Sequence, residues 1–254
     1  RLLPEIHLIP WRRTHVLAVE VFPSPSRPHY VRAIGFPAGV YVRVGSTNRQ
    51  ADAAAVAELQ RMVRGLSFDE EPLPELSSEA LDFRLASECF ATVRKLTRAH
   101  LRTLHLLATH QRREVPTVGG VLLFGKDRLK HFPDSWLRAG CFAGTDRSTI
   151  LDSSNLTACP VHAVEDALRF VQRNTRRAVE VKSMHHREVW EFPVVALREA
   201  IINAVVHADY AQRGSPLRLA VFSDRIEIEN PGNLPPGLTI EDIRRGVSKL
   251  RNRV

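Results

Sequence analysis

A segment near the C-terminal end of the 254-residue chain carries three polar side chains at a regular spacing. Residues 198–210 have the sequence REAIINAVVHADY, in which Glu199, Asn203 and His207 recur every four residues within an apolar run. On an α-helix, side chains four positions apart lie on the same face. We therefore expect an acid, an amide and an imidazole, groups that exchange protons or coordinate ions, to form one polar stripe on an otherwise apolar helix.

The stripe has two interpretations. It is either the solvent-exposed face of an amphipathic helix or one wall of a binding site, and the second interpretation needs a partner element. The segment that follows provides one, because the alternating Ile226 and Ile228 predict a strand that runs into the turn Asn230-Pro231-Gly232. Glycine in such a turn lets the backbone come close to whatever lies beyond the strand end.

The helix and the strand together resemble the GHKL-type ATPase module of RecG-like, helicase-related transcriptional regulators. The resemblance rests on REAIINAVVHADY and RGSPLRLAVFSDRIEIENPGNLPPGLTIEDI; it is close over 190–254 and looser back to residue 115. It implies that the helix is the N box of the family, with Glu199 as the general base and Asn203 as a Mg²⁺ ligand. An amide oxygen coordinates Mg²⁺ without adding charge, and a carboxylate one turn away can deprotonate water.

The same resemblance implies ATP and Mg²⁺ as cofactors, in a site that contains Asn203, His207, Asn230 and Gly232. The chain departs from the family at Asn230, where GHKL ATPases have an Asp that binds the adenine amine. An amide oxygen is a weaker acceptor than a carboxylate. The lid with a second glycine box is not recognisable either. A non-enzymatic interaction protein with a degenerate GHKL fold therefore remains the alternative to a Mg²⁺-dependent ATPase.

The N-terminal quarter has the pattern of a β-rich module. The expected elements are strands over 15–22 and 39–45 and a capped helix over 46–63. Ser46, Thr47 or Asn48 can accept the free N–H groups at the start of that helix.

The sequence YVRVGSTNR in this module resembles the end of the divergent AlbA domain found in Schlafen proteins and in the same regulators. The resemblance implies nucleic-acid binding, with Arg43 and Arg49 flanking a turn where phosphate could lie at a helix N-terminus. The net charge of +8 favours an anionic partner, with DNA as the first candidate, although an Arg-rich composition alone also explains it. A nucleic-acid-processing enzyme related to the Schlafen nucleases is a further alternative by analogy alone.

The remaining elements follow from periodicity and turn residues. We expect helices over 79–110 with a break near Thr97, strands over 118–125 and 135–144, helices over 159–175 and 194–208, and an antiparallel hairpin over 217–230. The sequence GVLLFGKD at 120–127 matches part of a P-loop pattern, but its four central apolar residues predict a buried strand instead of a phosphate-binding loop. The sequence therefore provides no motor of the helicase type.

Composition limits the class of protein. A hydrophobic content of 44% is sufficient for a folded core. The three cysteines form no CxxC pair, which argues against a disulfide framework or a zinc site and favours a cytoplasmic location. No apolar run approaches the roughly 18–20 residues that span a bilayer, so no membrane partner is expected. Residue 1 is Arg, and we expect the chain to be a fragment.

These observations predict a multi-domain α/β (α+β) protein. Its expected parts are the C-terminal part of a Schlafen/AlbA-like nucleic-acid-binding domain over 1–66, a linker over 67–79, a mixed region over 80–158 and an incomplete GHKL-like helix-on-sheet sandwich over 159–254. The predicted function is a transcriptional regulator that binds DNA through the first module and ATP through the last, with a homo-oligomer as an additional option.

Overall fold

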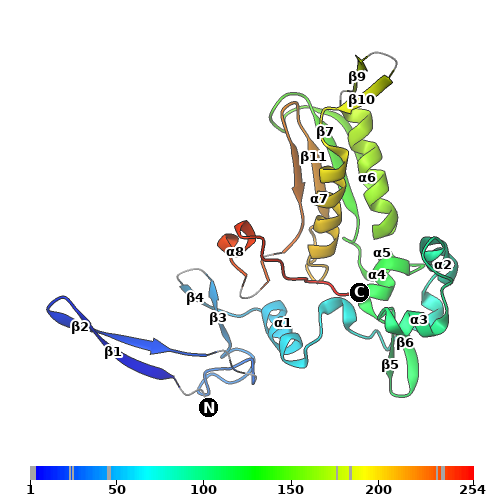
Figure 1. Cartoon of the computed structure of the whole chain (residues 1–254). Coiled ribbons are helices and arrows are strands. Elements are labelled where there is room, and N and C mark those ends of the chain that lie inside the picture. The colour runs from blue at the N-terminus through cyan, green and yellow to red at the C-terminus, as the bar shows by residue number, and fades with distance from the viewer. Residues whose placement is uncertain are drawn as a thin grey trace. The chain divides into compact units, whose positions relative to one another are not determined.

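The chain folds as two compact units, residues 1–66 and 67–254, whose elements Figure 1 labels in chain order. The computed structural model describes residues 4–22, 24, 26–44, 47–175, 177–182, 185–232, 234–235 and 238–254. Helices and several small sheets occur together, which confirms the predicted α+β class.

The first unit contains two antiparallel hairpins and one helix. Its elements are β1 (Glu5–Trp11), β2 (Thr14–Glu20), β3 (Tyr41–Val44), β4 (Thr47–Gln50) and α1 (Ala53–Arg64). β1 pairs with β2, and β3 pairs with β4. The strands expected over 15–22 and 39–45 are confirmed as β2 and β3, with small shifts at their ends.

The helix of this unit begins later than the sequence predicted, because β4 occupies the expected first turn. Its N-cap is Asp52, whose carboxylate accepts a hydrogen bond from the Ala55 N–H at 2.8 Å. The prediction that Thr47 or Asn48 caps the helix is wrong, because both residues belong to the strand that pairs with β3. The third predicted cap, Ser46, lies outside the described residues.

The second unit begins with a small, mainly helical region. Its elements are the 3₁₀ helices η1 (Phe68–Glu70) and η2 (Ser78–Ala80), the helices α2 (Phe83–Phe90), α3 (Arg98–Thr103), α4 (Val118–Phe124) and α5 (Arg128–His131), and the hairpin of β5 (Leu107–His110) and β6 (Arg113–Pro116). Leu106, Val121 and Phe124 are among the buried side chains of its core. The helical stretch expected over 79–110 is thus two short helices, and Thr97 at the predicted break is the N-cap of α3. The prediction is wrong at its end, because residues 107–110 form the strand β5.

The prediction of a strand over 118–125 is wrong, because this apolar run is the helix α4. The Thr117 hydroxyl accepts a hydrogen bond from the Gly120 N–H at 3.0 Å and so caps the helix. Nearly every residue of the run is buried, so the run contains no polar residues at helical spacing. Without them, the sequence pattern does not distinguish a buried helix from a buried strand. A Cβ at Gly120 would lie 2.3 Å from the Leu106 carbonyl oxygen, so glycine is required for this close packing. As a buried helix, the segment still offers no phosphate-binding loop.

The rest of the second unit is a four-stranded sheet with two long helices on one face (Figure 1). Its elements are β7 (Leu137–Phe142), β8 (Ile150–Leu156), α6 (Pro160–Asn174), β9 (Arg177–Lys182), β10 (His185–Trp190), α7 (Val194–His207), β11 (Leu217–Val221), β12 (Ile226–Glu229) and α8 (Ile240–Arg244). The strand order is β12-β11-β7-β8, with β11 parallel to β7 and the other neighbours antiparallel. β9 and β10 form a separate hairpin.

The elements expected in this region are confirmed. The run over 135–144 is β7, the amphipathic segment over 159–175 is α6, and the segment over 194–208 is α7. The segment over 217–230 forms the antiparallel pair β11 and β12.

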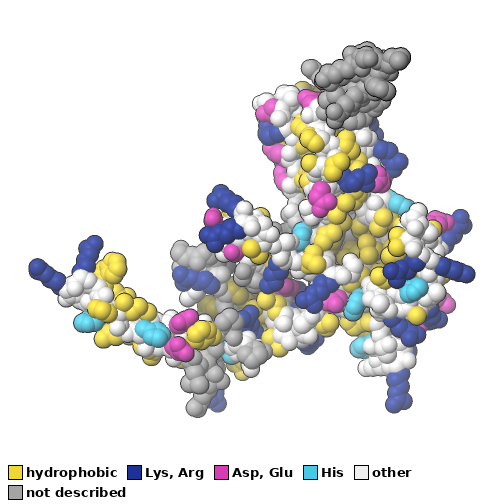
Figure 2. All heavy atoms as spheres, in the orientation of Figure 1, with side chains coloured by type: hydrophobic (Ala, Val, Ile, Leu, Met, Phe, Trp, Pro, Cys, Tyr) yellow, Lys and Arg dark blue, Asp and Glu magenta, His cyan; other side chains and the backbone are white. Residues whose placement is uncertain are grey.

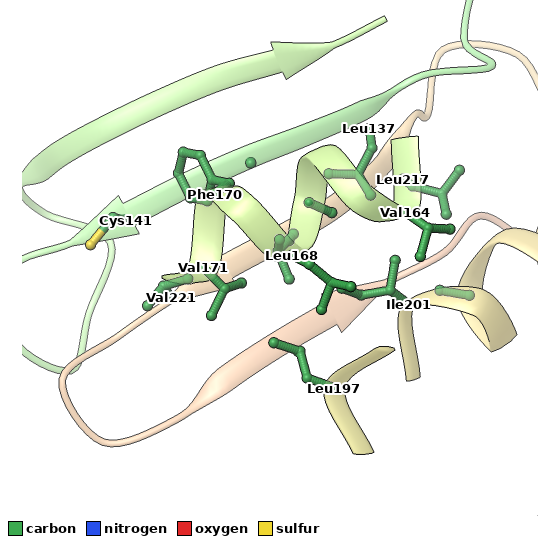
Figure 3. Close-up of a cluster of buried hydrophobic side chains, with 14 of the residues drawn as sticks. Leu137, Cys141, Val164, Leu168, Phe170, Val171, Leu197, Ile201, Leu217 and Val221 are labelled. Carbon is green, nitrogen blue, oxygen red and sulfur yellow. The ribbon is translucent and has the colours of Figure 1, made fainter. Parts of the chain in front are cut away.

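A single hydrophobic core joins the sheet to α6 and α7. Leu217, Leu219 and Val221 alternate along β11 so that all three point to the helices, as expected for a strand with one buried face. Leu197 and Ile201 of α7 enter the same cluster, and Figure 3 shows them near the side chains of α6. This packing fixes which side of α7 faces outward.

No helix in the described part of the chain has both the length and the apolar character needed to cross a bilayer.

The packing of α7 in the core predicts how substitutions on this helix change the free energy of unfolding. Ile201 is completely buried, whereas Val195 on the same helix is 83% exposed. We expect Ile201→Ala to lower the free energy of unfolding by about 2–5 kcal/mol, because it leaves a cavity between the helix and the sheet. The matched control Val195→Ala should change it by less than about 0.5 kcal/mol. Urea unfolding measures both, and similar effects of the two substitutions would contradict the described packing.

Candidate functional site

The helix α7 places the polar stripe on the side opposite the core. Pro193 is its N-cap residue, and the buried Leu197, Ile201 and Ala204 form the inner face. Glu199 and Asn203 are exposed, and His207 at the C-terminal end of the helix is half-buried.

A pocket of about 830 Å³ lies along the C-terminal half of this stripe. Asn203 and His207 of α7 line it together with Asn230 and Gly232, which follow β12. The other lining residues are Ala200, Ala204, Ile228, Leu234, Pro235, Leu238, Ile243, Gly246, Val247, Ser248 and Lys249. The structure thus brings together four of the five residues assigned to the nucleotide site from the sequence.

Glu199 is the fifth, and it does not line the pocket. A helix turns 3.6 residues per revolution, so each four-residue step moves a side chain about 40° around the axis and about 6 Å along it. Glu199 and His207 are two such steps apart and therefore face directions that differ by about 80°. Residues spaced four apart therefore shift gradually around the helix axis, and Glu199 lies outside the part of the helix that lines the pocket.

The lining is apolar on one part and polar on another. Ile228, Leu234 and Ile243 are among its aliphatic side chains, while two amides, an imidazole, a hydroxyl and an ammonium group supply the polar atoms. No carboxylate occurs among the described lining residues, and Lys249 is their one Lys or Arg. Such a surface suits a ligand with a flat apolar body and an anionic group.

The turn after β12 is fixed against the end of α7. Gly232 has a φ of 112°, and a Cβ there would lie 2.6 Å from the Cβ of Asp209. The Asp209 N–H donates a hydrogen bond to the Pro231 carbonyl oxygen at 2.9 Å. The glycine in this turn is therefore required by backbone conformation and by space, and it keeps Asn230 next to the polar stripe.

Another wall of the pocket is a segment that sequence reasoning did not identify. Residues 246–254, here called the strap, follow α8 and lie against α7 and η1. The Asn252 amide donates to the carbonyl oxygens of Val206 and Ala208 at 2.7 and 2.9 Å, and so satisfies acceptors at the end of α7. Arg251 forms an ion pair with Asp209 at 3.2 Å, in which both side chains are largely buried.

The end of the strap is held by a buried carboxylate in the segment that was predicted to be a linker. Asp69 of η1 is 2% exposed and accepts hydrogen bonds from the N–H groups of Arg253 and Val254 at 2.5 and 2.6 Å. The Val254 side chain fills the space beside Gly119 of α4. No local pattern could have indicated these contacts, because the partners lie far apart in the sequence.

The two arginines of the predicted nucleic-acid site lie on the β3–β4 hairpin. Val42 is opposite Arg49 and Arg43 is opposite Asn48 in the pairing register. Opposite residues of an antiparallel pair project to the same face, and neighbours along a strand project to opposite faces. Arg43 and Arg49 therefore point to different faces of the hairpin, and the helix α1 begins only after β4. The adjacent pair His185–His186 has side chains outside the described structure.

Comparison with known proteins supports a relationship at the C-terminal end. Residues 214–254 match the family model described as "Putative ATP-dependent DNA helicase recG C-terminal". The match covers β11, β12, α8 and the strap, and it begins after α7. It relates this part of the chain to the ATPase-like C-terminal domain of RecG-type proteins. No match was found among curated proteins.

A solved structure has a similar fold over most of the chain. It is the crystal structure of the DIP2311 protein from Corynebacterium diphtheriae, with a TM-score of 0.55 and 20% sequence identity. The alignment covers 94% of this chain and 47% of that one, so the chain spans about half the length of the DIP2311 protein. At this identity the similarity concerns the fold alone.

The hydrogen bonds of Asn252 predict how its substitution affects the stability and hydrogen exchange of the strap. We expect Asn252→Ala to lower the free energy of unfolding by about 1–2 kcal/mol, because it removes a side-chain donor from two half-buried carbonyl oxygens. It should also speed amide hydrogen exchange in residues 246–254. The control is Asn155→Ala, since Asn155 is an exposed residue of β8. Unchanged exchange in the strap after Asn252→Ala would show that these hydrogen bonds do not hold it.

Proposed function

We propose that the second unit binds an adenine nucleotide in the pocket between α7, the turn after β12 and the strap. The observation that carries the proposal is the convergence of Asn203, His207, Asn230 and Gly232, from two separate elements, on one pocket without a lining carboxylate. Its volume of about 830 Å³ falls within the range of small-molecule sites. The match of residues 214–254 to an ATPase-related family supports the same assignment.

The residues present fit a Mg²⁺ ion that arrives with the nucleotide. Asn203 offers a neutral amide oxygen at the pocket wall, and the phosphates and water would supply the remaining ligands. Mg²⁺ would reduce the charge repulsion between the bound phosphates. The side chains of this chain would then orient the nucleotide, with Asn230 as the acceptor for the adenine amine and the aliphatic residues against the ring.

Hydrolysis is a separate part of the proposal and depends on Glu199. Its carboxylate is exposed and lies one turn before Asn203, outside the pocket lining. As a general base it would act on a water at the edge of the site. We expect Glu199→Gln to leave nucleotide affinity unchanged and to abolish whatever ATP hydrolysis the wild-type chain shows.

The test of nucleotide binding is a thermal shift with ATP, with and without Mg²⁺. A ligand at a hundred times its dissociation constant stabilises the folded state by about 2.7 kcal/mol, which is readily detected. Asn203→Ala should remove the Mg²⁺-dependent part of the shift. Asn155→Ala, an exposed Asn on β8 outside this pocket, is the matched control and should leave the shift unchanged.

The absence of a shift with ATP, ADP or GTP would contradict nucleotide binding. The alternative of an interaction protein, in which the polar stripe contacts a partner chain, would then be preferred. Asn230→Asp provides a further check, because a carboxylate is the stronger acceptor for an exocyclic amine and should strengthen adenine binding.

A second candidate function, nucleic-acid binding by the first unit, is favoured by the charge distribution. Residues 1–66 contain nine Arg and four Asp or Glu, so this quarter of the chain carries five of the eight excess positive charges. Figure 2 shows Lys and Arg side chains dispersed over the face in view, with Asp and Glu between them. Such a surface suits weak, sequence-independent contacts to phosphate. Together with the nucleotide site, this makes a nucleotide-responsive DNA-binding regulator the complete proposal.

The hairpin arrangement gives a test of that second function. Because Arg43 and Arg49 point to different faces, a duplex lying on one face should contact one of them. We expect one of the two single variants, Arg43→Ala or Arg49→Ala, to weaken binding and to reduce the slope of affinity against salt by about one unit. Fluorescence anisotropy with a duplex at low salt measures this. Unchanged affinity in both variants would exclude the hairpin from the DNA contact.

A further inference from the structure

We infer that the strap holds Lys249 as the phosphate-binding residue of the pocket. The inference rests on the proposed nucleotide binding and specifies which end of the nucleotide the strap contacts. Four consecutive strap residues, Gly246 to Lys249, line the pocket, so the strap forms one of its walls.

The strap is anchored at the first two of these four residues and again just after the fourth. Gly246 has a φ of 81° and donates its N–H to the Ile243 carbonyl oxygen at 2.9 Å, just after the end of α8. The Val247 N–H donates to the Asp242 carbonyl oxygen, also at 2.9 Å. After them come the Arg251–Asp209 ion pair and the Asn252 hydrogen bonds to α7. Lys249 is therefore held two residues before the ion pair of Arg251 with Asp209, which lies just after the helix that presents Asn203 and His207.

The charge of the wall indicates the kind of group that it binds. Lys249 brings a positively charged ammonium group to a surface whose described lining residues include no acid. Ser248 beside it adds a hydroxyl, and His207 faces the same space. These polar groups, grouped around the Lys249 ammonium, suit a ligand group with several anionic oxygens. The aliphatic part of the lining would then contact the adenine base. The phosphates of the nucleotide are the matching part.

The experiment compares ligands that share the adenosine but differ in phosphate. ATP, ADP and adenosine are titrated calorimetrically into the wild-type chain and into Lys249→Ala, Lys249→Arg and Arg244→Ala. A hydrogen bond to a charged group corresponds to a loss of about 10–100-fold in affinity. We expect this loss for ATP and ADP in Lys249→Ala, an unchanged affinity for adenosine, and a partly retained affinity for ATP in Lys249→Arg.

Arg244→Ala is the control for non-specific charge. Arg244 belongs to α8, its side chain is 74% exposed, and it does not line the pocket. Its loss removes one positive charge near the site but no predicted contact, so ATP affinity should change by less than about 3-fold. An equal effect of Arg244→Ala and Lys249→Ala would overturn the assignment of Lys249.

The titrations distinguish an error in the nucleotide site from an error in the role of Lys249. If the wild-type chain binds neither ATP nor adenosine, the nucleotide site itself is wrong and the role of Lys249 falls with it. If the wild-type chain binds ATP and Lys249→Ala binds it equally well, the site stands and the strap assignment is overturned. The strap assignment is also overturned if Lys249→Ala lowers the affinities for ATP and for adenosine by the same factor. Unchanged melting temperatures without ligand show that the variants are folded.

Discussion

The arrangement of the second unit depends on the burial of one face of α7 against the sheet. Ile201 is completely buried and Leu197 nearly so, and both contact the core shared by α6 and the strands. This contact fixes the rotation of the helix about its axis. Asn203 must then face outward, although it is only two residues from the most deeply buried side chain of the helix. The pocket on the outer side of α7 depends on this orientation.

The outward face gains its neighbours from segments that follow in the sequence. The turn at Gly232 packs against Asp209, and the strap returns to the same helix end through Arg251 and Asn252. One helix terminus is thus the attachment point for two walls of the pocket. The buried Asp69 extends this arrangement to the small helical region, because it binds the last N–H groups of the strap.

The elements that the sequence predicted correctly are those whose pattern is visible in neighbouring residues. The apolar period of α7 and the alternation in β11 and β12 are local, and so both the helix and the hairpin were predicted correctly. The run at 118–125 is almost entirely buried and carries no apolar period that identifies a helix. Its closest contact, that of Gly120 with Leu106, joins residues that are separated in the sequence. The opposite orientations of Arg43 and Arg49 follow from a strand pairing that the spacing alone does not show. The strap contacts join residues that are distant in the sequence.

The most direct test of the nucleotide site is photo-crosslinking of the whole chain with 8-azido-ATP, followed by peptide mapping. The structure predicts that the label attaches within the pocket walls, to residues 200–207 or 228–249, and that excess ATP prevents the labelling. Labelling that is confined to other parts of the chain, or that excess ATP does not prevent, would contradict a nucleotide site between α7, β12 and the strap.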